Sequence, residues 1–271
     1  MKDFSNIRSL YNPVQPLVKR PCDEVVYTEF LPDPKLTNLI FCYWQLKTDQ
    51  PLTDTFYYRV VADGCIDIFF ELQNPGESFV MGFSNAYTAF PLEESFNYVG
   101  IRFLPSAFPQ IFRINASELT NRFESLKTVV TPTAEFIRLN FDPAFSTDKI
   151  ATVLDKHFLS LITDLKIAPD VRLYGAMEII LQKQGILSLE KDLDVGISSR
   201  QLRRLFEFYI GDTAKTFSKV VRFQNLLRNE SPPGAQGAIQ PFFDAGYYDQ
   251  AHFIKEFKTM FGATPGRAFD L

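Results

Sequence analysis

The stretch that decides the fold is "GYYDQAHFIKEFKTMFG", residues 246–262, near the carboxyl end of the chain. Its apolar side chains recur at the spacing of one helical face: Phe253, Ile254, Phe257, Met260 and Phe261. Three polar side chains fall on the other face near the start of the same helix: Gln250, His252 and Lys255. The pattern predicts a short helix that packs on a core and presents polar groups at its leading end.

A second stretch, "DVGISSRQLRRLFEFYIG" at residues 194–211, repeats this plan. Gly196 suits a tight turn, Ser198 suits a helix N-cap and Gly211 suits a helix end. Its apolar stripe consists of Leu202, Leu205, Phe206 and Tyr209, and its exposed positions are Ser199, Arg200, Arg203 and Arg204. In the first-quoted stretch, Gly246 and Gly262 take the places of Gly196 and Gly211.

Two such units, joined by a predicted helix over 213–227, fit the helix-turn-helix plan. In that plan the second helix of each unit enters the DNA major groove with its N-terminal half. Arginine pairs with guanine and glutamine with adenine, while histidine and lysine contact base acceptors or phosphates. We therefore expect recognition helices at about 199–210 and 249–261.

Residues 170–271 resemble the paired helix-turn-helix domain of AraC-type (AraC/XylS) transcription regulators. The matching motifs are the Gly-Tyr-Tyr-Asp-Gln-Ala-His-Phe run at 246–253, the Phe-Lys and Phe-Gly pairs that follow it, and Thr264-Pro265-Gly266. The resemblance implies DNA-facing positions at Ser199, Arg200, Arg203 and Arg204 in the first unit and at Gln250, His252 and Lys255 in the second. The sequence departs from the family at Asp192 and Phe242, where members usually place a small residue.

The amino-terminal half follows a different pattern. Between 24 and 104, short segments rich in Val, Ile, Phe and Tyr alternate with Gly, Pro, Asn and Asp, which predicts an antiparallel barrel or sandwich. Helical patterns follow, most clearly at 146–165. The segments "VVADGCIDIFFEL" (60–72) and "VGIRFLPSAF" (99–108) weakly resemble the sensor region of one AraC branch, which implies a cupin-like β-barrel followed by helices used for dimerisation or domain contact.

The chain is thus predicted to be α+β with two domains. Residues 1–168 form the β-barrel with helices, for sensing or dimerisation, and residues 169–271 form the DNA-binding domain. Helices are predicted near 170–183, 187–194, 199–210, 213–227, 238–244, 249–261 and 265–269, with an exposed loop at 229–237.

The net charge of the chain alone gives little indication of whether the protein binds a nucleic acid. The formal net charge is −4, but residues 172–271 hold 13 Lys and Arg against 11 Asp and Glu, while residues 1–171 hold 15 against 21. The basic excess of the carboxyl-terminal part is small, so the local placement of its cations carries the argument.

The compartment expected from the sequence is the cytoplasm. The three cysteines are odd in number and lack metal-ligand spacing, which is typical of a reducing compartment. The first residues lack a long apolar segment of a signal peptide, and no apolar run approaches the ~20 residues that span a bilayer.

An enzyme is not expected, and neither is a cofactor or a metal. The only histidines are His157 and His252, too few for a metal site of the cupin kind. Cys65 lacks a partner histidine in its half of the chain. Low-ranking candidates for ligand binding are Tyr43, Trp44, Asp63 and Cys65, although a turn with a structural strand and ordinary core packing also account for them.

The sequence therefore favours a transcription regulator that binds double-stranded DNA sequence-specifically, with an amino-terminal domain that senses an unknown small-molecule effector or forms a homodimer. Contact with RNA polymerase is implied by the resemblance, and no membrane partner is expected. The alternative is a small-molecule-binding barrel protein whose helical domain mediates protein contacts rather than DNA binding.

Overall fold

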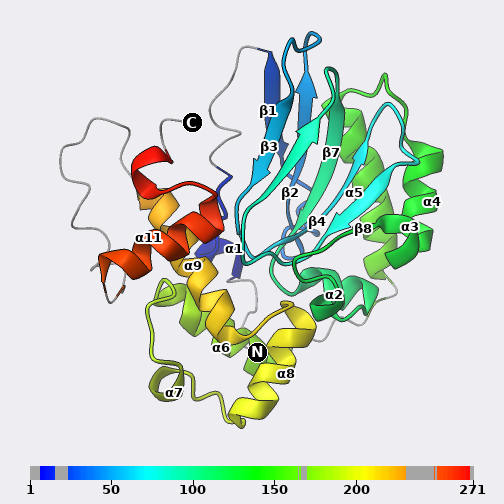
Figure 1. The fold of residues 1–271 in the computed structure, drawn as a ribbon. Helices are drawn as coiled ribbons and strands as arrows, with labels where there is room; N and C mark the ends of the chain where they lie inside the picture. Colours follow the sequence, from blue (N-terminus) through cyan, green and yellow to red (C-terminus); the bar gives the residue numbers. More distant parts are fainter. Residues whose placement is uncertain are drawn as a thin grey trace.

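The structure is a computed structural model that describes residues 7–15, 24–163, 165, 170–229, 247 and 249–268. A β module with flanking helices is followed by a group of helices (Figure 1). Four sequence predictions lie outside the described residues: the helix at 238–244 with Phe242, the loop after residue 229, the turn at Gly246, and most of the linker after residue 165.

The β module contains a six-stranded antiparallel sheet and a two-stranded one. The large sheet has the order β1-β2-β7-β4-β5-β8, and β3 pairs with β6 in the small sheet. The strands are β1 (Val25–Phe30), β2 (Ile40–Thr48), β3 (Phe56–Val60), β4 (Ile66–Glu71), β5 (Ser78–Met81), β6 (Thr88–Leu92), β7 (Asn97–Phe103) and β8 (Phe123–Ser125). The predicted antiparallel β module followed by a helical region is confirmed, with two facing sheets in place of a continuous hydrogen-bonded cylinder.

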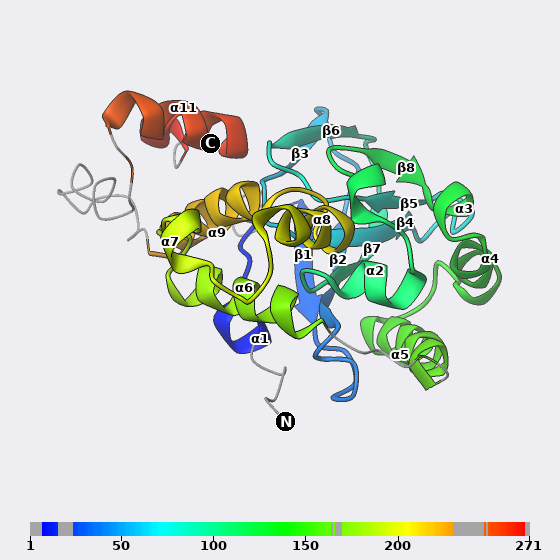
Figure 2. The same ribbon diagram turned by 90° about the horizontal axis from the view of Figure 1, so that it is seen from below.

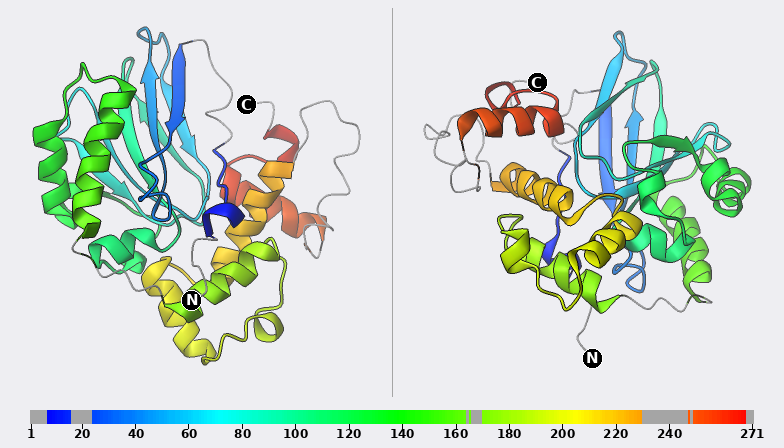
Figure 3. Two further views of the ribbon diagram at one scale, coloured as in Figure 1. Left: turned by 180° about the vertical axis from the view of Figure 1, so that it is seen from behind. Right: turned by 60° about the horizontal axis from the view of Figure 1, so that its bottom comes forward.

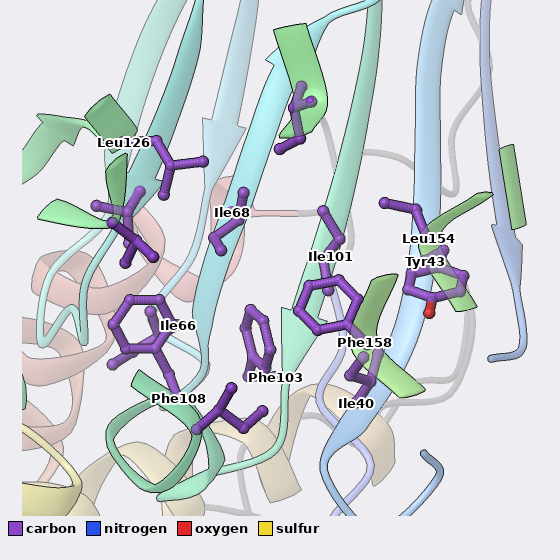
Figure 4. Close-up of a cluster of buried hydrophobic side chains, with 14 of the residues drawn as sticks. Ile40, Tyr43, Ile66, Ile68, Ile101, Phe103, Phe108, Leu126, Leu154 and Phe158 are labelled. Carbon is purple, nitrogen blue, oxygen red and sulfur yellow. The ribbon is translucent and has the colours of Figure 1, made fainter. Parts of the chain in front are cut away.

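Helices cover one face of the large sheet, as Figures 2 and 3 show. They are α2 (Ala107–Phe112), the 3-10 turn η3 (Ala116–Glu118), α3 (Leu126–Val129), α4 (Thr131–Asn140) and α5 (Thr147–Thr163). Since side chains alternate along a strand, Tyr43, Ile68 and Ile101 point toward these helices and form a core with Leu154 and Phe158 of α5 (Figure 4).

The remaining helices form a second group. They are α6 (Val171–Gln182), α7 (Leu189–Asp192), α8 (Ser199–Tyr209), α9 (Ala214–Asn229), α11 (Gln250–Phe261) and the 3-10 turn η4 (Pro265–Arg267), with the short α1 (Ile7–Leu10) packed on α6. In Figure 2, α11, α9 and α6 lie in succession beside the β module. The predicted helices outside residues 230–248 agree with these bounds to within a few residues.

The second group shares its core with the β module. Val61, Ala62, Cys65 and Phe83 are buried in one cluster with Phe206, Phe217 and Phe257 of the helices. Tyr11 extends the contact, because its ring packs near Phe217 and its hydroxyl donates to the carbonyl of Asp63. The two modules are therefore packed on each other, and the boundary at 168/169 stays a prediction.

Within the described part of the chain, no helix combines the length and the apolar character needed to cross a lipid bilayer.

Candidate nucleic-acid interface and cavity

The first candidate reading helix, α8, begins at a capping box. The Ser198 hydroxyl accepts from the backbone N–H of Gln201 at 3.3 Å, and the Gln201 side chain accepts from the backbone N–H of Ser198 at 3.1 Å. Gly196 before it has φ +73°, and Gly211 after it has φ +112°. The N-cap and the two turns predicted from the sequence are confirmed at these residues, and they fix where the helix starts and ends.

The buried face of α8 holds Leu202 and Phe206, which leaves its basic face in solvent. All four positions predicted to face DNA are exposed: Ser199, Arg200, Arg203 and Arg204. Arg203 Nε lies 2.6 Å from Glu207 Oε1, one helical turn along the same exposed surface. Exposed pairs of this kind contribute less than about 1 kcal/mol, so Arg203 can exchange Glu207 for a phosphate or a base.

Asp192, which departs from the small residue usual in the family, is the last residue of α7 and faces the end of α6. One carboxylate oxygen lies 2.6 Å from Lys183 Nζ, and the other accepts from the backbone N–H of Ser188 at 2.7 Å. The Lys183 hydrogen bond lowers the pKa of Asp192. The carboxylate is thus accommodated as a surface group that holds the start of α7.

The second candidate reading helix, α11, is capped in a similar way. The Asp249 carboxylate accepts from the backbone N–H of His252 at 2.7 Å, and Gly262 ends the helix with φ +91°. Phe257, Met260 and Phe261 are buried. The three predicted DNA-facing residues are exposed: Gln250, His252 and Lys255.

A buried ion cluster that the sequence reading missed attaches α11 to α9. Glu256 Oε1 lies 2.5 Å from Arg222 Nη2, and Glu256 Oε2 lies 3.1 Å from Lys219 Nζ. Burial raises the pKa of Glu256, but the hydrogen bonds and charges of Arg222 and Lys219 outweigh burial and lower it overall. The Tyr247 ring covers the Arg222 guanidinium at 4.0 Å and meets the His252 ring edge-on. No short-range pattern in the sequence signals this contact, because Arg222 and Glu256 are 34 residues apart in the chain.

Both candidate helices point their N-terminal ends away from the β module. In Figure 1, the N-terminal ends of α8 and α11 lie away from the sheets and their C-terminal ends lie toward them. Thr120 donates to the carbonyl of Gly211 at the end of α8, and the backbone N–H of Tyr87 donates to the carbonyl of Thr259 near the end of α11. The exposed polar ends of the two helices are therefore held clear of the β module.

A cavity of about 230 Å³ lies in the β module, lined from both sheets. Trp44, which lines the cavity, lies against Gly100 of β7, where an added Cβ would overlap the indole. Seven of the residues that line the cavity are aromatic: Trp44, Tyr58, Phe69, Phe79, Phe90, Tyr98 and Phe123. Glycine at position 100 is what allows the indole to lie flat across β7.

One end of the cavity carries a buried charge cluster. Arg102 Nη2 lies 3.0 Å from Asp67 Oδ2, and Arg102 Nε lies 3.5 Å from Asp63 Oδ2. The Trp44 indole N–H donates to Asp67 at 3.0 Å. Burial raises the pKa of Asp67 to about 6, against the lowering effect of the Arg102 charge. Sequence reading singled out Asp63 and Trp44 but missed Arg102, because the pairing of Arg102 with Asp67 across β4 and β7 depends on register.

The four residues considered for ligand binding separate into two places. Trp44, Asp63 and Cys65 line the cavity. Tyr43 lies on the opposite face of the large sheet, where its hydroxyl donates to Asp155 at 2.9 Å, because neighbouring residues of a strand point to opposite faces. Burial raises the pKa of the Cys65 thiol, and the Asp63 charge adds to that shift, so the thiol stays protonated.

Two loops belong to both the cavity and the helical group. In the loop 61–65, the backbone N–H of Ala62 donates to the carbonyl of Met260, and its carbonyl accepts from Gln224 at 2.8 Å. In the loop 82–87, Gly82 and Ser84 line the cavity while Phe83 is buried against the helices. Both loops therefore contact the cavity on one side and the helical group on the other.

Comparison with known proteins identifies the kind of domain that the carboxyl-terminal part of the chain forms. A family model described as a helix-turn-helix domain matches residues 194–270, and one described as a domain of unknown function (DUF6597) matches residues 28–125. No match was found among curated proteins. The match includes the helices whose capped and exposed ends are described above, so residues 194–270 form a helix-turn-helix domain of the class that DNA-binding transcription regulators carry.

Within that class, this domain is of the AraC type, and the resemblance inferred from the sequence is confirmed over residues 194–270. Two crystal structures of ToxT from Vibrio cholerae are similar to the chain. An apo variant has 12% identity and a TM-score of 0.43, with 84% of this chain and 97% of that chain covered. ToxT from strain O395 has 11% identity and a TM-score of 0.40, with 92% and 98% covered.

Proposed function

We propose that the protein regulates transcription by placing α8 and α11 in adjacent major grooves on one face of the duplex. Base contacts come from Arg203, Arg204 and Gln250, with help from His252. The observation that carries the proposal is that each helix has a capped, exposed polar N-terminal end on the side away from the β module. This is the part of a recognition helix that meets base edges in helix-turn-helix proteins.

The remaining exposed positions suit the phosphate backbone. Ser199 and Arg200 lie in the first turn of α8, and Lys255 lies one turn into α11. Phosphate contacts set the position of a protein on DNA and make its affinity depend on salt. We expect binding to weaken steeply as the salt concentration rises.

The amino-terminal module is proposed to sense a small-molecule effector in its cavity. The support is the pair of loops, 61–65 and 82–87, that line the cavity and also hold α9 and α11. An occupant that shifts these loops changes the position of the second reading helix. A homodimer and a contact with RNA polymerase belong to the same proposal, and the AraC resemblance is their support.

The test is selection of bound fragments from a host genomic library by the full-length protein, followed by footprinting of the enriched fragments. We expect protection of two segments about one helical turn, roughly 34 Å, apart. An Arg204→Ala, Gln250→Ala double variant should lose the enrichment. Arg138→Ala, which removes an exposed arginine from α4, should retain it. Failure of the wild-type protein to enrich any fragment would refute the proposal.

A further inference from the structure

The charges around the cavity are unbalanced. Among the described residues that line it, three carry carboxylates, Asp63, Asp67 and Glu77, and Arg102 alone carries a positive charge. Two nitrogens of the Arg102 guanidinium already pair with these carboxylates, Nη2 at 3.0 Å from Asp67 and Nε at 3.5 Å from Asp63, whereas Nη1 is buried without a hydrogen-bond partner. Glu29 lies 3.9 Å from the same guanidinium and adds a further negative charge. An anionic occupant would therefore meet net repulsion, and a cationic one net attraction.

The walls favour the same kind of occupant. Ring faces attract cations, most strongly for tryptophan, and a cavity of about 230 Å³ bounded by aromatic side chains also suits a flat apolar group. The indole of Trp44 lies beside the carboxylate of Asp67, so an apolar surface and a negative charge adjoin each other. The opposite rim carries Glu77, an exposed residue of the loop before β5 that reaches the cavity.

We propose that the cavity binds a small aromatic amine in its protonated form. The aromatic ring of the ligand packs between the rings of the two sheets, and its ammonium group lies at the carboxylate-rich part of the wall. This inference rests on the proposed role of the cavity as the effector site, and it adds the chemical class of the effector.

The experiment compares three probes that share one ring and differ in charge: phenethylamine, phenethyl alcohol and phenylacetate. Trp44 is the only tryptophan in the chain and lines the cavity, so its fluorescence in the full-length protein reports occupancy directly. We expect phenethylamine to bind about tenfold or more tightly than phenethyl alcohol. Phenylacetate should bind more weakly than the alcohol. Thermal unfolding with each probe gives a second readout that does not depend on fluorescence.

Matched variants test the role of charge without disturbing the buried cluster. Glu29→Gln removes an exposed carboxylate that lies 3.9 Å from Arg102, at the same cluster as Asp63 and Asp67, and should weaken phenethylamine binding about twofold or more while leaving the alcohol unchanged. Glu94→Gln removes an exposed carboxylate that does not line this cavity and should change neither. Phenylacetate binding as tightly as the amine, equal binding of amine and alcohol, or no binding of any probe to folded protein would each overturn the proposal.

The titrations need no DNA, which separates this inference from the proposed function. If the probes fail while the protein still enriches genomic fragments, the ligand class is wrong and DNA reading stands. If the amine binds while no fragment is enriched, the cavity is a ligand site and the DNA-reading proposal fails.

Discussion

Arg222 of α9 and Glu256 of α11 form an ion pair of 2.5 Å between Nη2 and Oε1, and both side chains are largely buried. The ring of Tyr247 covers the guanidinium from another side. This contact joins the second proposed reading helix to the helix that follows the first one. Lys219 of α9 pairs with the same carboxylate at 3.1 Å, and Phe223 packs on Phe257 beside them, so the two ion pairs supply a directional restraint on how α11 is presented.

Glu256→Ala should destabilise the protein strongly. The change leaves a buried guanidinium without its carboxylate, which costs about 3–5 kcal/mol in comparable buried pairs. Urea unfolding measures the loss. The matched control is Glu207→Ala, which breaks the exposed pair with Arg203 on α8 and should cost less than about 1 kcal/mol. Equal losses in the two variants would show that the Arg222–Glu256 pair does not hold α11.

Arg204→Ala should lower DNA affinity by about 1–3 kcal/mol and relax the preference at one base pair. The reason is that arginine recognises guanine through two hydrogen bonds that no other base pair reproduces in the major groove. Binding to a library of operator variants measures both effects. A uniform loss over all sequences would assign Arg204 to a phosphate instead, and Arg138→Ala in α4 should leave the profile unchanged.

Asp67 should make the stability of the fold depend on pH between about 4 and 6. Its pKa is raised by burial from 3.8 to about 6 in the folded protein, with Arg102 opposing and Asp63 adding to the shift. A carboxyl whose pKa is higher in the folded than in the unfolded state binds protons more readily when folded. Stability contributed by this group therefore falls, by up to about 3 kcal/mol, as pH rises through that window.

The measurement for Asp67 is urea unfolding of the wild type and of Asp67→Asn at a series of pH values. The difference between the two curves isolates this residue from other carboxylates. We expect the wild type to lose stability relative to the variant on going from pH 4 to pH 6. A difference that is constant over this range would contradict the raised pKa.

Gly262→Ala should loosen the contact between α11 and the β module. Gly262 has φ +91°, which alanine adopts only at a cost of about 1–2 kcal/mol, and its added Cβ would overlap the Tyr87 ring. The control is Gly266→Ala in the turn η4, where an added Cβ meets nothing within 4 Å and the change should stay within about 0.5 kcal/mol. Thermal unfolding compares the two, and similar losses would show that the Tyr87 contact is unimportant.

Local sequence signals predicted many elements of the fold, and the exceptions have physical reasons. β6 carries no clear strand signal because Pro91 lies within it, and proline is tolerated there since the strand pairs only with β3. β8 has three residues, too few for a periodic pattern. α4 begins with a proline in its first turn and has a modest apolar stripe, so its helical pattern is weak.

The candidate interface was largely predictable and the cavity was not. By itself, the sequence determined α8 and α11 with their N-caps, turns and exposed polar ends, because helix periodicity and capping act over three or four residues. Only the tertiary structure decided that Trp44 lies across Gly100, that Arg102 meets Asp67, and that Glu256 reaches Arg222. These contacts depend on strand register and helix packing between residues distant in the chain, and short-range patterns do not encode either one.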